Sequence, residues 1–127
     1  MEIFGREYGF LYSVGAQQEI SDLCPGADLT KLPSLLDGTI KAKTAVYMDL
    51  ICILSKWYEK AALAKALAEG KEYAEKPLTK DLLMIMDQEQ FAAVQLAAFQ
   101  TLKKDKAQTV EAETAKKNGN GTPSALS

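Results

Sequence analysis

The side chains with the most chemical potential in this sequence are carboxylates, but their spacing does not bring them together. Asp49 and Glu59 lie ten residues apart in an apolar-rich segment, and Glu69, Glu72 and Glu75 cluster in a hydrophilic one. Acid–base catalysis needs a group whose pKa is shifted by burial or by a neighbouring charge. Carboxylates of this kind are normally solvated. We therefore expect these groups, Glu59 included, on polar surface.

Other reactive residue types are scarce or isolated. The chain has no histidine, which removes the commonest general base and zinc ligand. Cys24 and Cys52 lie in different segments without a Cys-x-x-Cys motif, which is typical of small buried apolar side chains in a reducing cytosol. Gly15 forms no phosphate-binding loop, and Ser13 is best explained as a helix cap. The sequence predicts no enzyme, no metal site and no cofactor.

Composition and charge also exclude two classes of partner. The net charge is −2, and Arg6 is the only arginine among fifteen basic residues. Nucleic-acid binders usually carry clustered Arg and Lys, so we expect no nucleic-acid partner. The most apolar run, residues 51–54, is far shorter than the roughly 20 residues of a membrane span. We therefore expect no membrane association, and no targeting segment is visible.

The elements that would position any site begin with an alternating stretch. Tyr8, Phe10 and Tyr12 recur at period two, and Gly5-Arg6 can supply a two-residue hairpin turn. This pattern predicts strands over 2–4 and 7–12. An isolated hairpin is marginal in water, so it needs helices behind it or an edge from another chain.

Capping residues and helical periodicity organise the chain after the hairpin. Ser13, Thr79 and Asp87 are predicted N-caps, and Cys24-Pro25-Gly26 is a predicted stop. The predicted helices cover residues 14–24, 29–36, 40–68, 80–86 and 88–104.

The fold class that results is α+β. An N-terminal β-hairpin packs on a bundle of about four to five helices, and the single domain covers residues 1–106. Residues 107–127 contain few large apolar side chains. Such a segment cannot bury enough apolar area to offset the entropy of ordering, so it is predicted to be a disordered C-terminal tail.

The central helix carries two apolar stripes where a surface helix needs one. The first comprises Ile40, Thr44, Tyr47, Ile51, Leu54 and Tyr58, and the second comprises Val46, Leu50, Ile53 and Trp57. The first stripe suffices for packing within the subunit. The second either completes the core or faces a partner, and we take it as the first candidate for partner binding. Tyr8 and Tyr12 of the hairpin are the next candidates.

The hairpin itself has two interpretations. Its free edge could bind a neighbouring subunit or an extended segment of a client by β-augmentation. Alternatively, the hairpin merely covers the helical core.

The order of three stretches resembles a known family. They are "EIFGREYGFLYSVGAQQEISDLCPGADL", "ICILSKWYEKA" and "PLTKDLLMIMDQEQFAAVQLAAF". Together they resemble the small tail assembly chaperones of long-tailed phages and prophages of Gram-positive hosts, over residues 1–102. The family's opening pattern is matched by Ile3, Gly5, Tyr8, Tyr12, Ser13, Val14, Gly15 and Ala16. Arg6 stands where lysine is common, and Phe10-Leu11 departs from the usual strand spacing.

The resemblance implies a non-catalytic protein of the host cytoplasm. Such chaperones bind the tape measure protein, keep it soluble and help recruit tail tube subunits during phage tail morphogenesis. A homo-oligomer is left open, as is a longer form made by ribosomal frameshifting. The alternative is a structural virion protein, such as a small head–tail connector or tail completion subunit.

Overall fold

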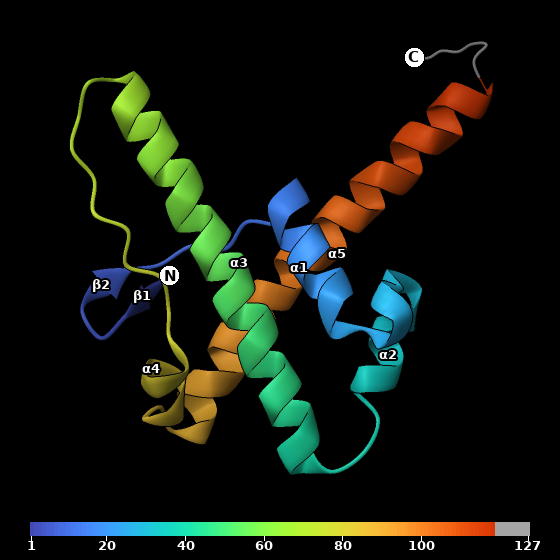
Figure 1. Ribbon diagram of the computed structural model, residues 1–127, viewed down its shortest axis with the longest axis horizontal. Helices are drawn as coiled ribbons and strands as arrows, with labels where there is room; N and C mark the ends of the chain where they lie inside the picture. The colour runs from blue at the N-terminus through green and yellow to red at the C-terminus, as the bar shows by residue number, and fades with distance from the viewer. Residues whose placement is uncertain (119–127) are drawn as a thin grey trace.

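The computed structural model describes the backbone of residues 1–118 and the side chains of residues 1–103. Within that range the chain forms one two-stranded antiparallel hairpin followed by helices (Figure 1). The elements are β1 (Glu2–Ile3), β2 (Arg6–Glu7), α1 (Val14–Leu23), η1 (Pro25–Ala27), η2 (Leu29–Lys31), α2 (Leu32–Leu35), α3 (Ile40–Ala68), α4 (Lys80–Met84) and α5 (Gln88–Asn118). The predicted α+β fold class, a hairpin with about five helices, is confirmed.

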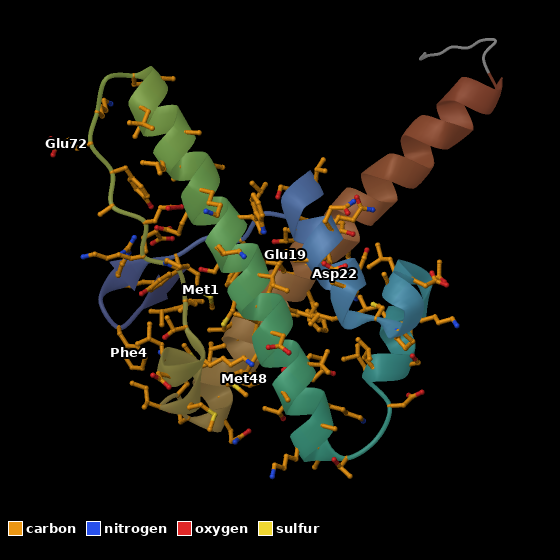
Figure 2. All side chains as sticks on the ribbon, in the orientation of Figure 1. Met1, Phe4, Glu19, Asp22, Met48 and Glu72 are labelled. Atoms are coloured by element: carbon orange, nitrogen blue, oxygen red, sulfur yellow. The ribbon has the colours of Figure 1, made fainter. Side chains whose placement is uncertain are left out.

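The hairpin is shorter than predicted and turns one residue earlier. Ile3 lies opposite Arg6, so the turn residues are Phe4 and Gly5, with φ of 50° and 81°. Positive φ at both positions is what a tight hairpin turn of type I′ requires. The predicted Gly5-Arg6 turn and the strand over 7–12 are therefore wrong. The exposed side chain of Phe4 lies at the tip of the hairpin (Figure 2).

The segment after β2 is laid directly on the helices. The Leu11 N–H donates a hydrogen bond to the Leu54 carbonyl of α3 at 3.1 Å. Gly9 lies so close to the Tyr58 ring that a Cβ at this position would overlap it. Tyr8, Phe10 and Tyr12 pack against the core. The period-two alternation therefore comes from a chain segment lying on helices, without a sheet partner.

α3 is the central helix of the described chain and packs against α1, α4 and α5. In Figure 1 α3 and α5 cross, and α1 lies against α3 near the crossing. The core cluster gathers side chains from the hairpin, from these helices and from the connector before α4. Its buried members are Ile3, Tyr8, Ala16, Ile20, Leu50, Ile51, Leu54, Leu78, Leu83, Val94 and Ala98.

The helices begin where short polar side chains can cap them. Ser13, Thr39, Thr79 and Asp87 each accept a hydrogen bond from the backbone N–H three residues further on. Such bonds satisfy N–H groups that have no partner inside the helix. All of these caps except Thr39 are predicted from the sequence.

α5 continues past Lys104, its predicted end, to Asn118. Its C-terminal half projects from the rest of the molecule (Figure 1). The side chains of residues 104–118 lie outside the described part of the chain, and residues 119–127 lie outside it altogether. The predicted disordered tail over 107–127, and the domain boundary at 106, therefore stay predictions.

Candidate interaction surface

The second apolar stripe of α3 is divided between the core and partly covered surface. Leu50 is 1% exposed, whereas Val46, Ile53 and Trp57 are half-buried and pack against the core. Leu50 presents no surface to a partner in this fold. Any partner contact through this stripe would involve the other three residues. Such a contact stays a prediction.

The two hairpin tyrosines also lie against the core. Tyr8 is buried, and its ring centroid lies 5.3 Å from the guanidinium carbon of Arg6. Tyr12 is half-buried and packs on the core cluster. Their predicted role in partner binding stays a prediction, and the two strands each contribute only two residues to the hairpin edge.

Trp57 is held in place by α1. Its Nε1–H donates to Glu19 Oε1 at 2.6 Å, and Lys56 Nζ donates to Glu19 Oε2 at 2.5 Å. Gly15 makes room for the indole, because a Cβ there would overlap the ring. Glu19 lies on α1 close to α3 (Figure 2). The pKa of Glu19 lies below its ordinary value, mainly because its carboxylate accepts the hydrogen bond from Lys56.

The fluorescence of Trp57 should therefore report on the titration of Glu19. A lowered pKa means that the carboxylate stays ionised, and keeps accepting from Trp57, to a lower pH than an ordinary glutamate does. The stabilisation that this carboxylate contributes is present above its unfolded-state pKa and is lost as the pH falls through the lowered value. We expect an acid transition in Trp57 emission at a pH below the ordinary pKa of a glutamate. The variant Glu19→Gln should lack it, and an unchanged transition in that variant would contradict the assignment.

Glu59 departs most from expectation. The sequence places it on the polar side of the central helix, yet its side chain is 1% exposed. Its Oε1 accepts hydrogen bonds from Arg6 Nη2 at 2.9 Å, from the Tyr73 hydroxyl at 2.8 Å and from the Lys76 N–H at 2.9 Å. The expectation is wrong because partners distant in the sequence replace water around the carboxylate. The pKa of Tyr73 is raised above its ordinary value. Burial is the main cause, and the hydrogen bond to Glu59 is the second.

The other carboxylates and the thiols that the sequence offered for catalysis form surface ion pairs or remain free cysteines. Asp49 pairs with Lys80 at 2.7 Å, Glu75 with Lys60 at 3.8 Å and Glu69 with Lys71 at 3.4 Å. Cys24 and Cys52 are free thiols. Burial raises the pKa of Cys52 to about 11, so this thiol is protonated at neutral pH and is a poor nucleophile.

A groove of mixed apolar and polar lining runs between α3, α4 and the start of α5, and the sequence pattern did not predict it. Its volume is about 270 Å³. Met48, on the half of α3 that lies near α4 and α5 in Figure 2, is one of the lining residues. The full lining is Ile40, Thr44, Tyr47, Met48, Leu83, Met84, Met86, Gln88, Phe91, Ala92 and Gln95.

The groove exposes large apolar side chains at its rim. Ile40 is 83% exposed and Met84 is 68% exposed, and Ile85 beside Met84 is also exposed. Ile40 belongs to the first stripe, which the sequence pattern assigned to packing within the subunit. That assignment fails at the N-terminal end of α3, where the Ile40 side chain lies at the rim of the groove and remains exposed. The run from Met84 to Met86 between two capped helices was the available sequence signal.

Contacts of the lining residues and their neighbours hold the walls of the groove together. The Tyr47 ring meets the Phe99 ring edge to face, with 5.2 Å between centroids. The Asp49–Lys80 ion pair joins α3 to α4. Methionine side chains are flexible and polarizable, and they are common on surfaces that accept apolar partners of varied shape. The arrangement suits reversible binding of apolar side chains.

Comparisons with known proteins add no relative. No family model, no curated protein and no solved structure matches the chain. Within residues 1–103, no group of three or more His, Cys, Asp or Glu side chains could hold a metal ion. None of the helices in the described part has the length and apolar character needed to cross a membrane.

Proposed function

We propose that this protein is a tail assembly chaperone of a long-tailed phage or prophage, which binds the tape measure protein and helps recruit tail tube subunits. It acts without covalent chemistry, in the host cytoplasm. The sequence resemblance of residues 1–102 suggests the family. The groove, with its exposed apolar rim, supplies a surface on which such a protein could bind its client.

The observation that carries the proposal is the exposed apolar rim of the groove. Large apolar side chains such as Ile40 and Met84 gain free energy when they are covered, and contiguous exposed apolar surface often marks a site of interaction. A chaperone that keeps an insoluble client in solution needs such a surface.

Co-expression with the tape measure protein of the same genome tests the proposal. The wild-type chain should keep that protein soluble and co-purify with it. The variants Ile40→Asp and Met84→Asp should lose this effect while remaining folded, because both side chains are exposed. Lys71→Asp, at an exposed site on the turn after α3 and outside the groove lining, is the matched control and should bind normally.

Purified mature particles provide a second, independent measurement. A chaperone should be absent from them by mass spectrometry. If the protein were present in stoichiometric amount, the proposal would fail in favour of the alternative, a structural virion protein such as a small head–tail connector or tail completion subunit.

A further inference from the structure

The connector between α3 and α4, residues 70–79, runs back beside the C-terminal half of α3 (Figure 1). The Lys76 N–H donates to Glu59 Oε1 at 2.9 Å, and the Leu78 N–H donates to Ser55 Oγ at 2.8 Å. Both acceptors are buried on α3, and Leu78 is buried in the core. The connector forms neither helix nor strand, so contacts of this kind fix its path.

The local sequence of the connector favours a different conformation. Residues 69–75, "EGKEYAE", consist mainly of glutamate, lysine and alanine, which are strong helix formers. On a continuous helix Lys71 and Glu75 would lie four residues apart with opposite charges, which is favourable. Gly70 is the residue that disfavours helix here, and Pro77 would end it. The sequence therefore favours a continuation of α3 by about two turns.

The conformation of Gly70 ends α3 in the structure. Its φ of 72° lies in the left-handed region, and the Lys71 N–H donates to the Ala66 carbonyl at 2.7 Å, as is common after a helix that ends at a glycine. A Cβ at Gly70 would meet nothing within 4 Å. The backbone conformation, and not a lack of space, therefore calls for glycine. This one conformation directs the chain back along α3 instead of onward.

A longer α3 is incompatible with the contacts of a single subunit. From Ser55 to Glu75 a continuous helix spans roughly 30 Å, and the three residues from 76 to 78 reach about 10 Å at most. Leu78 would then lie at least about 20 Å from Ser55 of its own chain. The contacts of Leu78, and of the α4 and α5 helices that follow it, can then be formed only with α3 of a second copy.

We infer that two copies of this chain form a domain-swapped dimer, in which α3 continues through residue 75 and α4 and α5 of each copy pack on α3 of the other. Domain swapping reuses the contacts of the closed subunit. The Leu78–Ser55 hydrogen bond and the Asp49–Lys80 ion pair would both form between copies. The inference goes beyond the proposed function and does not depend on it.

The face of α3 that binds the connector would be covered again in the dimer. Helical spacing places Ala62 and Ala66 on the same face as Ser55 and Glu59. Because residue 78 of each copy reaches Ser55 of the other, the two extended helices lie antiparallel along this face, and alanine permits their close approach. Glu59 loses its hydrogen bonds from Tyr73 and Lys76 in the exchange. The closed monomer therefore prevails at low protein concentration and the dimer forms at high concentration.

A zero-length cross-link distinguishes the swapped dimer from other dimers. Unlabelled chains and chains labelled with heavy nitrogen are mixed in denaturant and refolded together at high concentration, and the dimer fraction is isolated by size exclusion. A carbodiimide then joins Asp49 to Lys80, whose charged atoms lie 2.7 Å apart. Mass spectrometry of the digest should show light–heavy linked peptides. A dimer of closed subunits would yield this link only as light–light and heavy–heavy pairs.

Gly70→Ala should favour the dimer, because alanine is strained at this φ but favoured within a helix. The association constant, measured by sedimentation after refolding, should rise about tenfold or more, since both hinges of the dimer gain. Gly26→Ala is the matched control. Gly26 has a φ of 64° and equally open surroundings, so this variant should lower the melting temperature without forming dimer. Adding Glu72→Pro at an exposed site of the connector (Figure 2) should return Gly70→Ala to the monomer, because proline follows a helix end readily but cannot continue the helix.

Light–heavy peptides linking Asp49 to Lys80, from either the wild-type or the Gly70→Ala chain, support the swap. The inference is overturned if neither chain yields these peptides after refolding at high concentration. An effect of Gly70→Ala on association no larger than that of Gly26→Ala would show that residues 69–75 do not join α3, and the inferred dimer would also be wrong. The cross-link measurement on the wild-type chain does not depend on whether a variant folds.

Discussion

Replacing Leu50 by Asp is expected to unfold the protein. Leu50 is 1% exposed in the centre of α3, so the substitution removes a packed side chain and buries an unpaired carboxylate. Even the milder Leu50→Ala should cost about 2–5 kcal/mol. Domains of this size have total stabilities of only about 5–15 kcal/mol. Far-UV circular dichroism should show loss of helix for the aspartate variant.

The matched control for Leu50→Asp is Ile40→Asp on the same helix. Ile40 is 83% exposed, so this variant should keep the helical spectrum and nearly the wild-type melting temperature. A folded Leu50→Asp protein would show that this side chain is accessible in solution. The second stripe would then face a partner, in line with the first candidate for partner binding from the sequence.

Replacing Glu59 by Ala should have the next largest effect. The change leaves the Arg6 guanidinium, the Tyr73 hydroxyl and the Lys76 N–H without their common acceptor. Breaking a buried ion pair by removing one partner costs about 3–5 kcal/mol. Arg6 keeps 29% of its side chain exposed, so we expect the lower end of that range. Urea unfolding followed by circular dichroism measures the change in the free energy of unfolding.

Two variants show whether the loss comes from the buried acceptor. Glu59→Gln keeps an acceptor oxygen and should be less destabilising than the alanine variant. Glu75→Ala breaks only the longer Glu75–Lys60 pair of 3.8 Å at the surface, where such a pair contributes under about 1 kcal/mol. If the alanine variants at 59 and 75 were equally stable, the hydrogen bonds to Glu59 would not hold the hairpin and connector in solution.

Local sequence signals predicted the helices well because these signals act over three or four residues. Ser13 caps α1 and Asp87 caps α5 as expected, and α3 covers the predicted residues 40–68. The hairpin was predicted less well. Alternating aromatic residues are compatible with either a strand or a segment lying on helices. Tertiary contacts such as the Leu11–Leu54 hydrogen bond and the approach of Gly9 to the Tyr58 ring distinguish the two.

The candidate site could not be predicted because it depends on distances that no local pattern encodes. Glu59 falls on the polar side of a helical wheel, and its burial results from Arg6 and Tyr73, which lie on either side of it in the sequence. The groove has a similar origin. The stripe containing Ile40 is continuous along α3, but α5 covers only part of it. Tertiary packing, and not the periodicity of apolar residues in the sequence, determines where one helix crosses another.

The arrangement of the core has a consequence for synthesis on the ribosome. Tyr8 is synthesised before Val94 and Ala98, yet both belong to the cluster that buries it. About 90 residues separate these positions, so at roughly 5–20 residues per second the aromatic N-terminus waits about 5 to 20 seconds for its full set of contacts. The rate of translation, as well as native stability, thus sets how long this segment is open to aggregation. Slowly translated codons between residues 60 and 98 would lengthen the interval without altering a single side chain of the native protein.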